Sequence, residues 1–213
     1  MQKKFMINLT LFLLVFGVMD LRAEGLDFSK SPAMSSTGFG SGLVKTGNLK
    51  ENSANPGFAV DFVIGKFIRK APNHGLVLDF FFELEGKGNK SLYPSYFESG
   101  KKSWAKFILG IGYIYRRAVW EENFISYTFV PGIGTQSIRE DKKSLSGNNS
   151  FVIHQKFGIH HQLTSGSNSS SFIGLSIFHT WDTNSELNGV KTDGHTFGVI
   201  LSFPVYLYSY CNR

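Results

Sequence analysis

Residues 75–86 read GLVLDFFFELEG, and this stretch decides the fold. From Leu76 to Leu84 every second residue is large and apolar, whereas the positions between them include Asp79 and Glu83. Side chains alternate between the two faces of a β-strand, so one face of this strand is wholly apolar and the other is mixed. A soluble β-sandwich turns the apolar face inward, whereas a transmembrane β-barrel turns it outward to lipid. The spacing between strands distinguishes the two folds.

Seven other segments show a period of two, and the eight candidate strands cover 37–46, 58–70, 75–86, 104–116, 123–134, 150–163, 170–180 and 194–207. The connections between them have about 11, 4, 17, 6, 15, 6 and 13 residues in chain order. Long polar connections therefore alternate with short ones. Up-and-down membrane barrels have this pattern, because their periplasmic turns are short and their extracellular loops are longer. The sequence predicts an all-β fold, an eight-stranded antiparallel up-and-down transmembrane β-barrel, with a soluble periplasmic β-protein as the alternative.

The N-terminus reads as a secretory signal peptide. Lys3 and Lys4 precede a short apolar stretch at 9–18, and Leu21-Arg22-Ala23 offers a cleavage site after Ala23. The apolar stretch is too short to span a membrane comfortably, which favours a signal peptide over an uncleaved N-terminal helix. We therefore expect a signal peptide over 1–23 and one barrel domain over 24–213, exported to the outer membrane of a Gram-negative bacterium.

Charge and cysteine content are consistent with such a barrel. Removing residues 1–23 takes away three positive charges and one negative charge, so the formal net charge falls from +6 to +4. Cys211 is the only cysteine, which excludes an internal disulfide. An eight-stranded barrel has an interior that side chains fill, so no wide pore is expected. Charged residues on the mixed faces should pair there: Asp61, Asp79, Glu83, Glu85, Lys106, Arg116, His154 and Lys156.

A histidine at the end of the seventh candidate strand is the main candidate for chemistry. His179 continues the phase of the lipid-facing residues, and Asp193 and His195 are in phase with the lipid-facing residues of the eighth strand. One hairpin should therefore bring these three residues together near the outer surface of the membrane. A histidine with a carboxylate partner is the base half of a hydrolytic triad. The alternative is that these polar residues only mark where the membrane ends.

The stretch from Phe129 to Val205 resembles the C-terminal part of the PagL-type lipid A 3-O-deacylases, over about 75 residues. The matching features are Pro131-Gly132-Ile133-Gly134, Asn149-Ser150-Phe151 with Phe157-Gly158, Phe178-His179-Thr180-Trp181-Asp182, Asp193, and a last strand that reaches Phe203-Pro204. The resemblance implies an eight-stranded outer-membrane barrel that hydrolyses an acyl ester of lipid A at the outer leaflet. It also implies that His179 is the general base and Asp193 its orienting acid.

The nucleophile of that family has no counterpart at its usual place. The family's serine lies two residues after the histidine, where this chain has Trp181. Thr183 and Ser185 are the candidate replacements, and each requires the hairpin to bend back toward His179. Asp182 stands at the position of an asparagine that assists the oxyanion, and a carboxylate there would repel a developing oxyanion. Trp181 also suits an aromatic anchor at the membrane interface.

The remaining motifs give weaker indications of a binding or metal site. Arg139, Lys142 and Lys143 fall in the third long connection and could contact phosphates of lipopolysaccharide. His160 and His161 are adjacent on a strand and face opposite sides, so we expect no metal site and no cofactor. The expected partners are lipid A or lipopolysaccharide and other membrane lipids, not nucleic acid. Two kinds of function remain open: ester hydrolysis on lipid A, and a non-catalytic barrel for adhesion, envelope stability or handling of small solutes or lipids.

Overall fold

The computed structural model describes residues 26–46, 55–85, 102–140, 143–146, 149–183, 186–187, 190–191 and 194–208. Eight long antiparallel strands make up the wall: β1 (Ala33–Thr46), β2 (Asn55–Ile68), β3 (Ala71–Glu85), β4 (Lys102–Trp120), β5 (Asn123–Glu140), β7 (Ser150–Ser165), β8 (Ser169–Thr183) and β11 (Gly194–Leu207). Short strands stand at one end: β6 (Lys143–Ser146), β9 (Glu186–Leu187) and β10 (Val190–Lys191). The predicted signal peptide over 1–23 lies outside the described residues.

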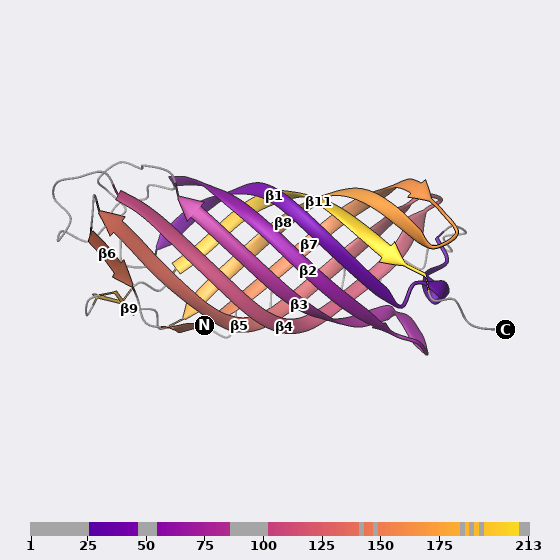
Figure 1. Cartoon of the computed structure of the whole chain (residues 1–213), viewed down its shortest axis with the longest axis horizontal. Helices are drawn as coiled ribbons and strands as arrows, with labels where there is room; N and C mark the ends of the chain where they lie inside the picture. The colour runs from indigo at the N-terminus through magenta and orange to yellow at the C-terminus, as the bar shows by residue number, and fades with distance from the viewer. Residues whose placement is uncertain are drawn as a thin grey trace, which may run out of the picture.

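The strands close into a barrel (Figure 1). Each strand pairs with its neighbours in the chain, β1 pairs with β11, and a β4–β5 pairing completes the ring. The turns at Arg69–Lys70 and Glu121–Glu122 are short, whereas eight residues separate β1 from β2 and sixteen separate β3 from β4. We take the end with the long connections as extracellular. The structure therefore confirms the predicted eight-stranded antiparallel up-and-down barrel.

The two faces of each strand match the period of two in the sequence. On β2, Phe58, Phe62 and Ile64 are exposed, whereas Asp61 and Val63 between them are buried. Similar exposed apolar residues ring the barrel, and Leu76, Ile111 and Ile177 each have about 60% of their surface exposed or more. A soluble protein does not leave so wide a band of apolar side chains in water, whereas a membrane barrel presents one to lipid. Within the described residues, no helix is long and apolar enough to cross a membrane.

Buried charges fill the middle of the lumen. Lys156 Nζ lies 2.7 Å from Asp61 Oδ2 and 3.0 Å from Asp79 Oδ2, and Lys106 Nζ lies 2.9 Å from Asp182 Oδ2. Burial of a charge is costly without a partner, so these pairs hold strands from opposite parts of the wall in one arrangement. The predicted interior pairing is confirmed for these lysines and aspartates. The side chain of Glu85 lies outside the described residues.

An N-terminal turn closes the periplasmic mouth of the barrel. The 3₁₀ turn η1 (Phe28–Lys30) is capped by Asp27, whose carboxylate accepts a hydrogen bond from Ser29 N at 2.9 Å. Hydrogen bonds from Ser29 hold the pKa of the Asp27 carboxyl below its usual value. The Phe28 ring enters the barrel, where it lies 5.4 Å from the Phe124 ring and 5.8 Å from the Tyr206 ring. The mouth is therefore filled by aromatic side chains.

Arg116 fastens this turn to the wall. Its guanidinium donates hydrogen bonds to the carbonyl oxygens of Phe28, Ser31 and Pro72, at 3.2, 2.8 and 3.0 Å. It also lies over the Phe67 ring, 3.4 Å from the ring centroid. We predicted an inward Arg116 in a salt-bridged interior. The structure confirms that it points inward and shows that backbone carbonyls and aromatic faces are its partners.

β4 and β5 extend furthest beyond their predicted C-terminal limits. The predicted fourth and fifth strands end at 116 and 134, whereas β4 reaches Trp120 and β5 reaches Glu140. The last residues of β5 are polar, and they continue because Ser137 to Glu140 pair with β4 on one side and β6 on the other. Backbone pairing outside the apolar band needs no alternating hydrophobicity, so the sequence pattern ends before the strand does.

Candidate functional site

The hairpin of β8 and β11 places His179 and His195 on the outer wall, as the phase of the two strands predicts. His179 is directly opposite Phe197, and His195 is directly opposite Trp181. The two histidines are therefore diagonal neighbours on the same face. Both lie toward the extracellular ends of their strands. Asp193, the predicted acid, lies outside the described residues, so its place beside His179 stays a prediction.

The two imidazoles form a hydrogen-bonded pair. His179 Nε2 and His195 Nδ1 are 3.0 Å apart, and the ring planes differ by 8°. The neighbouring rings run nearly parallel to them: Phe197 lies 4.3 Å from His179 between centroids, and Trp181 lies 6.2 Å from His195. This row of four rings holds both histidines in place. The sequence predicted that the two histidines are close, but not that they bond to each other.

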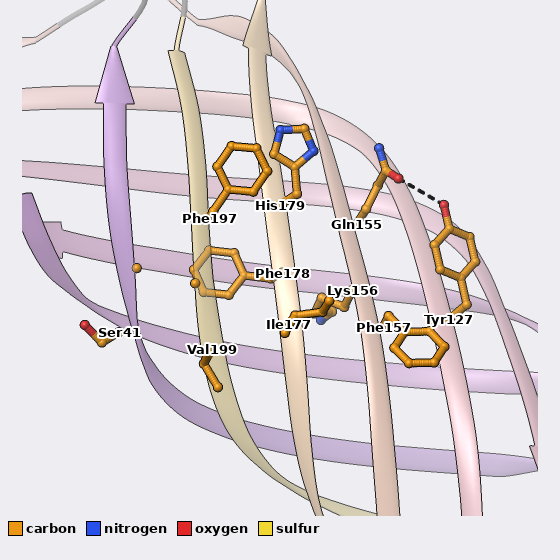
Figure 2. A pocket seen from close by; sticks show the side chains of 12 residues that line it. Ser41, Tyr127, Gln155, Lys156, Phe157, Ile177, Phe178, His179, Phe197 and Val199 are labelled. Atoms are coloured by element: carbon orange, nitrogen blue, oxygen red, sulfur yellow. Dashed lines mark hydrogen bonds between the residues drawn. The ribbon is translucent and has the colours of Figure 1, made fainter. Parts of the chain in front are cut away.

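A hollow in the outer wall begins at His179 and has a volume of about 550 Å³ (Figure 2). It crosses four neighbouring strands and reaches a fifth, and its lining is mostly apolar. The residues that line it are Ser41, Gly42, Tyr127, Gln155, Lys156, Phe157, Ile177, Phe178, His179, Phe197, Gly198 and Val199. Its size falls within the range of small-ligand pockets, roughly 300–1,000 Å³. Because outward side chains form its rim, a ligand would enter it from the lipid phase.

Two polar residues on this wall were missed by the reasoning from sequence. Gln155 is directly opposite His179 on β7, and its Oε1 accepts a hydrogen bond from the Tyr127 hydroxyl at 3.1 Å. Figure 2 shows this bond at the side of the hollow. A signal for Gln155 was present, because it interrupts the apolar series Phe151, Ile153, Phe157 and Ile159. The pairing of Gln155 with Tyr127 depends on how β5 and β7 align, which the pattern within one strand does not contain.

The hydrolytic arrangement is incomplete within the described residues. Trp181 is outward and part of the ring row, and the Thr183 hydroxyl donates to the carbonyl oxygen of Phe151 at 3.0 Å. No serine or threonine hydroxyl in the part of the chain that the structure describes hydrogen-bonds to His179. Ser185 lies outside the described residues. The site therefore has a candidate base but no placed nucleophile.

Asp182 does not lie near the proposed oxyanion position. It points into the lumen, where it is fully buried and forms an ion pair with Lys106. Successive residues of a strand face opposite sides, so a carboxylate at 182 cannot share the lipid-facing surface with His179. The expected repulsion of an oxyanion by Asp182 is therefore wrong, and its carboxylate instead helps to fill the interior.

The basic residues of the third long connection are partly in strands. Arg139 belongs to β5 and Lys143 begins β6, and these two strands form a hairpin in which Glu140 pairs with Lys143. The expectation that Arg139 lies in a loop is therefore wrong, because strand pairing continues above the apolar band. The side chains of Arg139 and Lys143, and all of Lys142, lie outside the described residues.

The fold is similar to that of solved outer-membrane proteins. Neisserial surface protein A matches with a TM-score of 0.60 and 13% sequence identity, over 84% of this chain and 98% of that chain. Ail, the attachment invasion locus protein of Yersinia pestis, matches with a TM-score of 0.47 and 14% identity, over 84% of this chain and 99% of that chain. No protein-family model matches this chain, and no curated protein matches it. The likeness shows the fold, a barrel of the outer-membrane type.

Proposed function

We propose that this protein is a non-catalytic barrel of a Gram-negative outer membrane that binds lipid on its outer wall. The observation that carries the proposal is the hollow beside His179, which opens on the lipid-facing side of the barrel. Within the described residues, the lumen offers no continuous route, because ion pairs fill its middle and the Phe28 ring enters its periplasmic mouth. A ligand that reaches the hollow therefore diffuses laterally in the membrane. Export by a signal peptide over 1–23 is part of this proposal.

Lipid A, the lipid anchor of lipopolysaccharide, is the proposed ligand. An apolar hollow on the extracellular half of the wall suits an acyl chain of the outer leaflet. The polar atoms of His179, Gln155 and Tyr127 at its side suit the ester and hydroxyl oxygens near the start of such a chain. Basic residues at the extracellular end, Arg139, Lys142 and Lys143, are the proposed contacts for its phosphates.

Two tryptophan variants on β11 test this proposal. Val199 lines the hollow, whereas Leu201 is two residues further on the same face and does not line it, and the two are 44% and 42% exposed. Val199→Trp should fill the hollow and reduce co-purifying lipid A about tenfold, and Leu201→Trp should leave it unchanged. Native mass spectrometry of barrels released from nanodiscs with lipid A or with phospholipid alone measures the bound lipid. Equal lipid A retention by both variants would refute the proposal.

Ester hydrolysis is the second candidate, and one observation favours it. The imidazole of His179 borders the hollow, and its hydrogen bond to His195 orients it there. A neutral imidazole held beside a bound ester can act as a general base toward a hydroxyl or a water molecule. The nucleophile would have to come from Thr183 after a rearrangement, or from Ser185, with Asp193 as the orienting acid.

Mass spectrometry of lipid A from cells with and without the chain separates the two candidates. Hydrolysis predicts loss of a 3-hydroxyacyl group in cells that make the unaltered chain. It predicts no loss with His179→Asn, and no loss with one of the two variants Thr183→Ala and Ser185→Ala, whichever removes the nucleophile. An unchanged lipid A spectrum under strong expression removes the hydrolase candidate and leaves the lipid-binding proposal untouched, since binding changes no mass.

A further inference from the structure

Two groups of potential metal ligands occur in the described residues, and the first already holds a cation. Ligand atoms of Asp61, Asp79 and His154 lie within 4.8 Å of one another in the lumen. The ammonium of Lys156, however, lies 2.7 Å from Asp61 and 3.0 Å from Asp79. It occupies the place of a metal ion between the two carboxylates, so this group is a buried ion-pair cluster.

The second group is the histidine pair on the outer wall. His179 Nε2 and His195 Nδ1 face each other at 3.0 Å across β8 and β11. A single hydrogen atom between the two nitrogens makes this bond. Because both rings sit at the extracellular ends of their strands and His195 is exposed, ions in the external water can reach them.

The distance between the two nitrogens fits chelation of a metal ion. Metal–imidazole bonds are about 2.0–2.1 Å long, so nitrogens 3.0 Å apart would subtend an angle of about 94° at a shared ion. A tetrahedral ion such as Zn²⁺ prefers about 109°, whereas Cu²⁺ and Ni²⁺ accept square or tetragonal sites with adjacent ligands near 90°. Cu²⁺ also binds nitrogen ligands most tightly among the divalent first-row ions.

We propose that His179 and His195 form a two-histidine site for a divalent transition-metal ion, with Cu²⁺ preferred. The histidine that donates the present hydrogen bond passes its proton through water to its own other ring nitrogen, and the accepting histidine already carries its proton on its other nitrogen. The ion then binds between the two facing nitrogens, and water completes the coordination. Each ring must turn about its Cβ–Cγ bond so that its lone pair points at the ion. The stacked rings of Phe197 and Trp181 keep the two imidazoles on neighbouring positions of the wall, which preserves the chelating distance.

This site goes beyond the proposed lipid binding and has only His179 in common with it. Lipid binding rests on the hollow, which Val199→Trp fills, whereas metal binding rests on two nitrogen atoms at its rim. A bound ion would occupy the His179 nitrogen that ester hydrolysis requires as a base. Metal loading and hydrolysis by His179 are therefore mutually exclusive states of the same side chain.

Titration of the purified, untagged full chain in detergent with CuCl₂ tests the site. We expect one Cu²⁺ per barrel by calorimetry, and an electron paramagnetic resonance spectrum with hyperfine splitting from two nitrogens. His179→Asn and His195→Asn should each weaken Cu²⁺ binding at least tenfold, since either change removes the chelate. His74→Asn is the matched control, because His74 is another strand histidine with a hydrogen-bond partner, Tyr113, but has no second histidine beside it.

Three results would overturn the proposal. The first is no Cu²⁺ binding by the unaltered chain, and the second is equal binding by the His179→Asn and His74→Asn variants. The third is Zn²⁺ binding tighter than Cu²⁺ binding, which would contradict the angle derived from the nitrogen distance. Migration of heated and unheated samples on a gel confirms that each variant is a folded barrel before it is titrated.

Discussion

Arg116 is a residue whose contacts are spread over three separate parts of the chain. It donates to carbonyls at the N-terminal turn and at Pro72 near the start of β3, and it stacks on Phe28, Phe67 and Tyr206. Planar guanidinium groups combine several fixed donors with a flat face, so one side chain satisfies buried carbonyls and packs on rings together. A lysine carries its three donors on a single nitrogen and has no flat face, so it could not make both sets of contacts.

Replacing Arg116 should weaken the barrel, and the next residue supplies the control. Arg116→Ala removes three hydrogen bonds to carbonyl oxygens and the packing of the guanidinium on aromatic rings, so we expect a loss of about 2–4 kcal/mol in the free energy of unfolding. Arg117 points to the other side of the wall, and Arg117→Ala should change the free energy of unfolding by less than about 0.5 kcal/mol. Urea unfolding in lipid vesicles measures both variants, and similar losses would contradict this role for Arg116.

At the scale of elements, β4 and β5 approach most closely where glycine replaces a side chain. A Cβ at Gly112 would lie against the carbonyl oxygen of Phe129 and 2.6 Å from Val130 Cα. Those atoms belong to the backbone of β5, next to Pro131, so no side-chain rotation can relieve the overlap. Gly110 pairs with Gly132 and Tyr113 with Phe129 in one register, and glycine at 112 lets the two strands stay close beside Pro131, which has no N–H to donate.

Gly112→Ala should therefore separate β4 from β5 locally and lower the free energy of unfolding by about 2 kcal/mol or more. Gly166→Ala is the control, because a Cβ there would be at an ordinary contact distance of 3.4 Å from Ser169 O. Urea unfolding and the yield of heat-modifiable barrel after refolding give the comparison. If Gly112→Ala unfolds at the same urea concentration as Gly166→Ala, the close approach has no energetic consequence.

At the scale of the whole molecule, the barrel is filled along its length. The pairs Lys106–Asp182 and Lys156–Asp61 occupy the extracellular half and the middle, and the aromatic cluster around Phe28 and Tyr206 occupies the periplasmic mouth. Eight strands enclose little more than the volume of these side chains. The outside, by contrast, carries a band of exposed apolar side chains, with polar side chains such as His179 and Gln155 among them.

The closed lumen predicts that the protein does not conduct small solutes. Liposomes reconstituted with the refolded full chain should swell in isotonic arabinose no faster than empty liposomes, whereas a large porin in the same lipid should cause rapid swelling. Light scattering measures the rate. Steady swelling that scales with the amount of folded barrel would contradict the filled interior and would favour a transport function.

The sequence by itself determined the number of strands, their faces and their direction through the membrane. Alternation along a strand and the length of each connection are local properties, so Leu76, Asp61 and His179 could be assigned to their faces without a structure. The inward lysines and aspartates were assigned in the same way. The basis of each assignment is the difference between lipid outside and packed polar groups inside.

Tertiary structure alone decided which residues meet. The His179–His195 bond, the Gln155–Tyr127 bond, the Lys106–Asp182 pair and the carbonyl partners of Arg116 all join different strands. Such contacts depend on the register between strands and on the closure of the ring. Shifting one strand by two residues against its neighbour keeps every side chain on the same face, so the alternating pattern within a strand cannot reveal the register. The hollow beside His179 has the same origin, because its walls come from five strands whose alignment only the closed barrel sets.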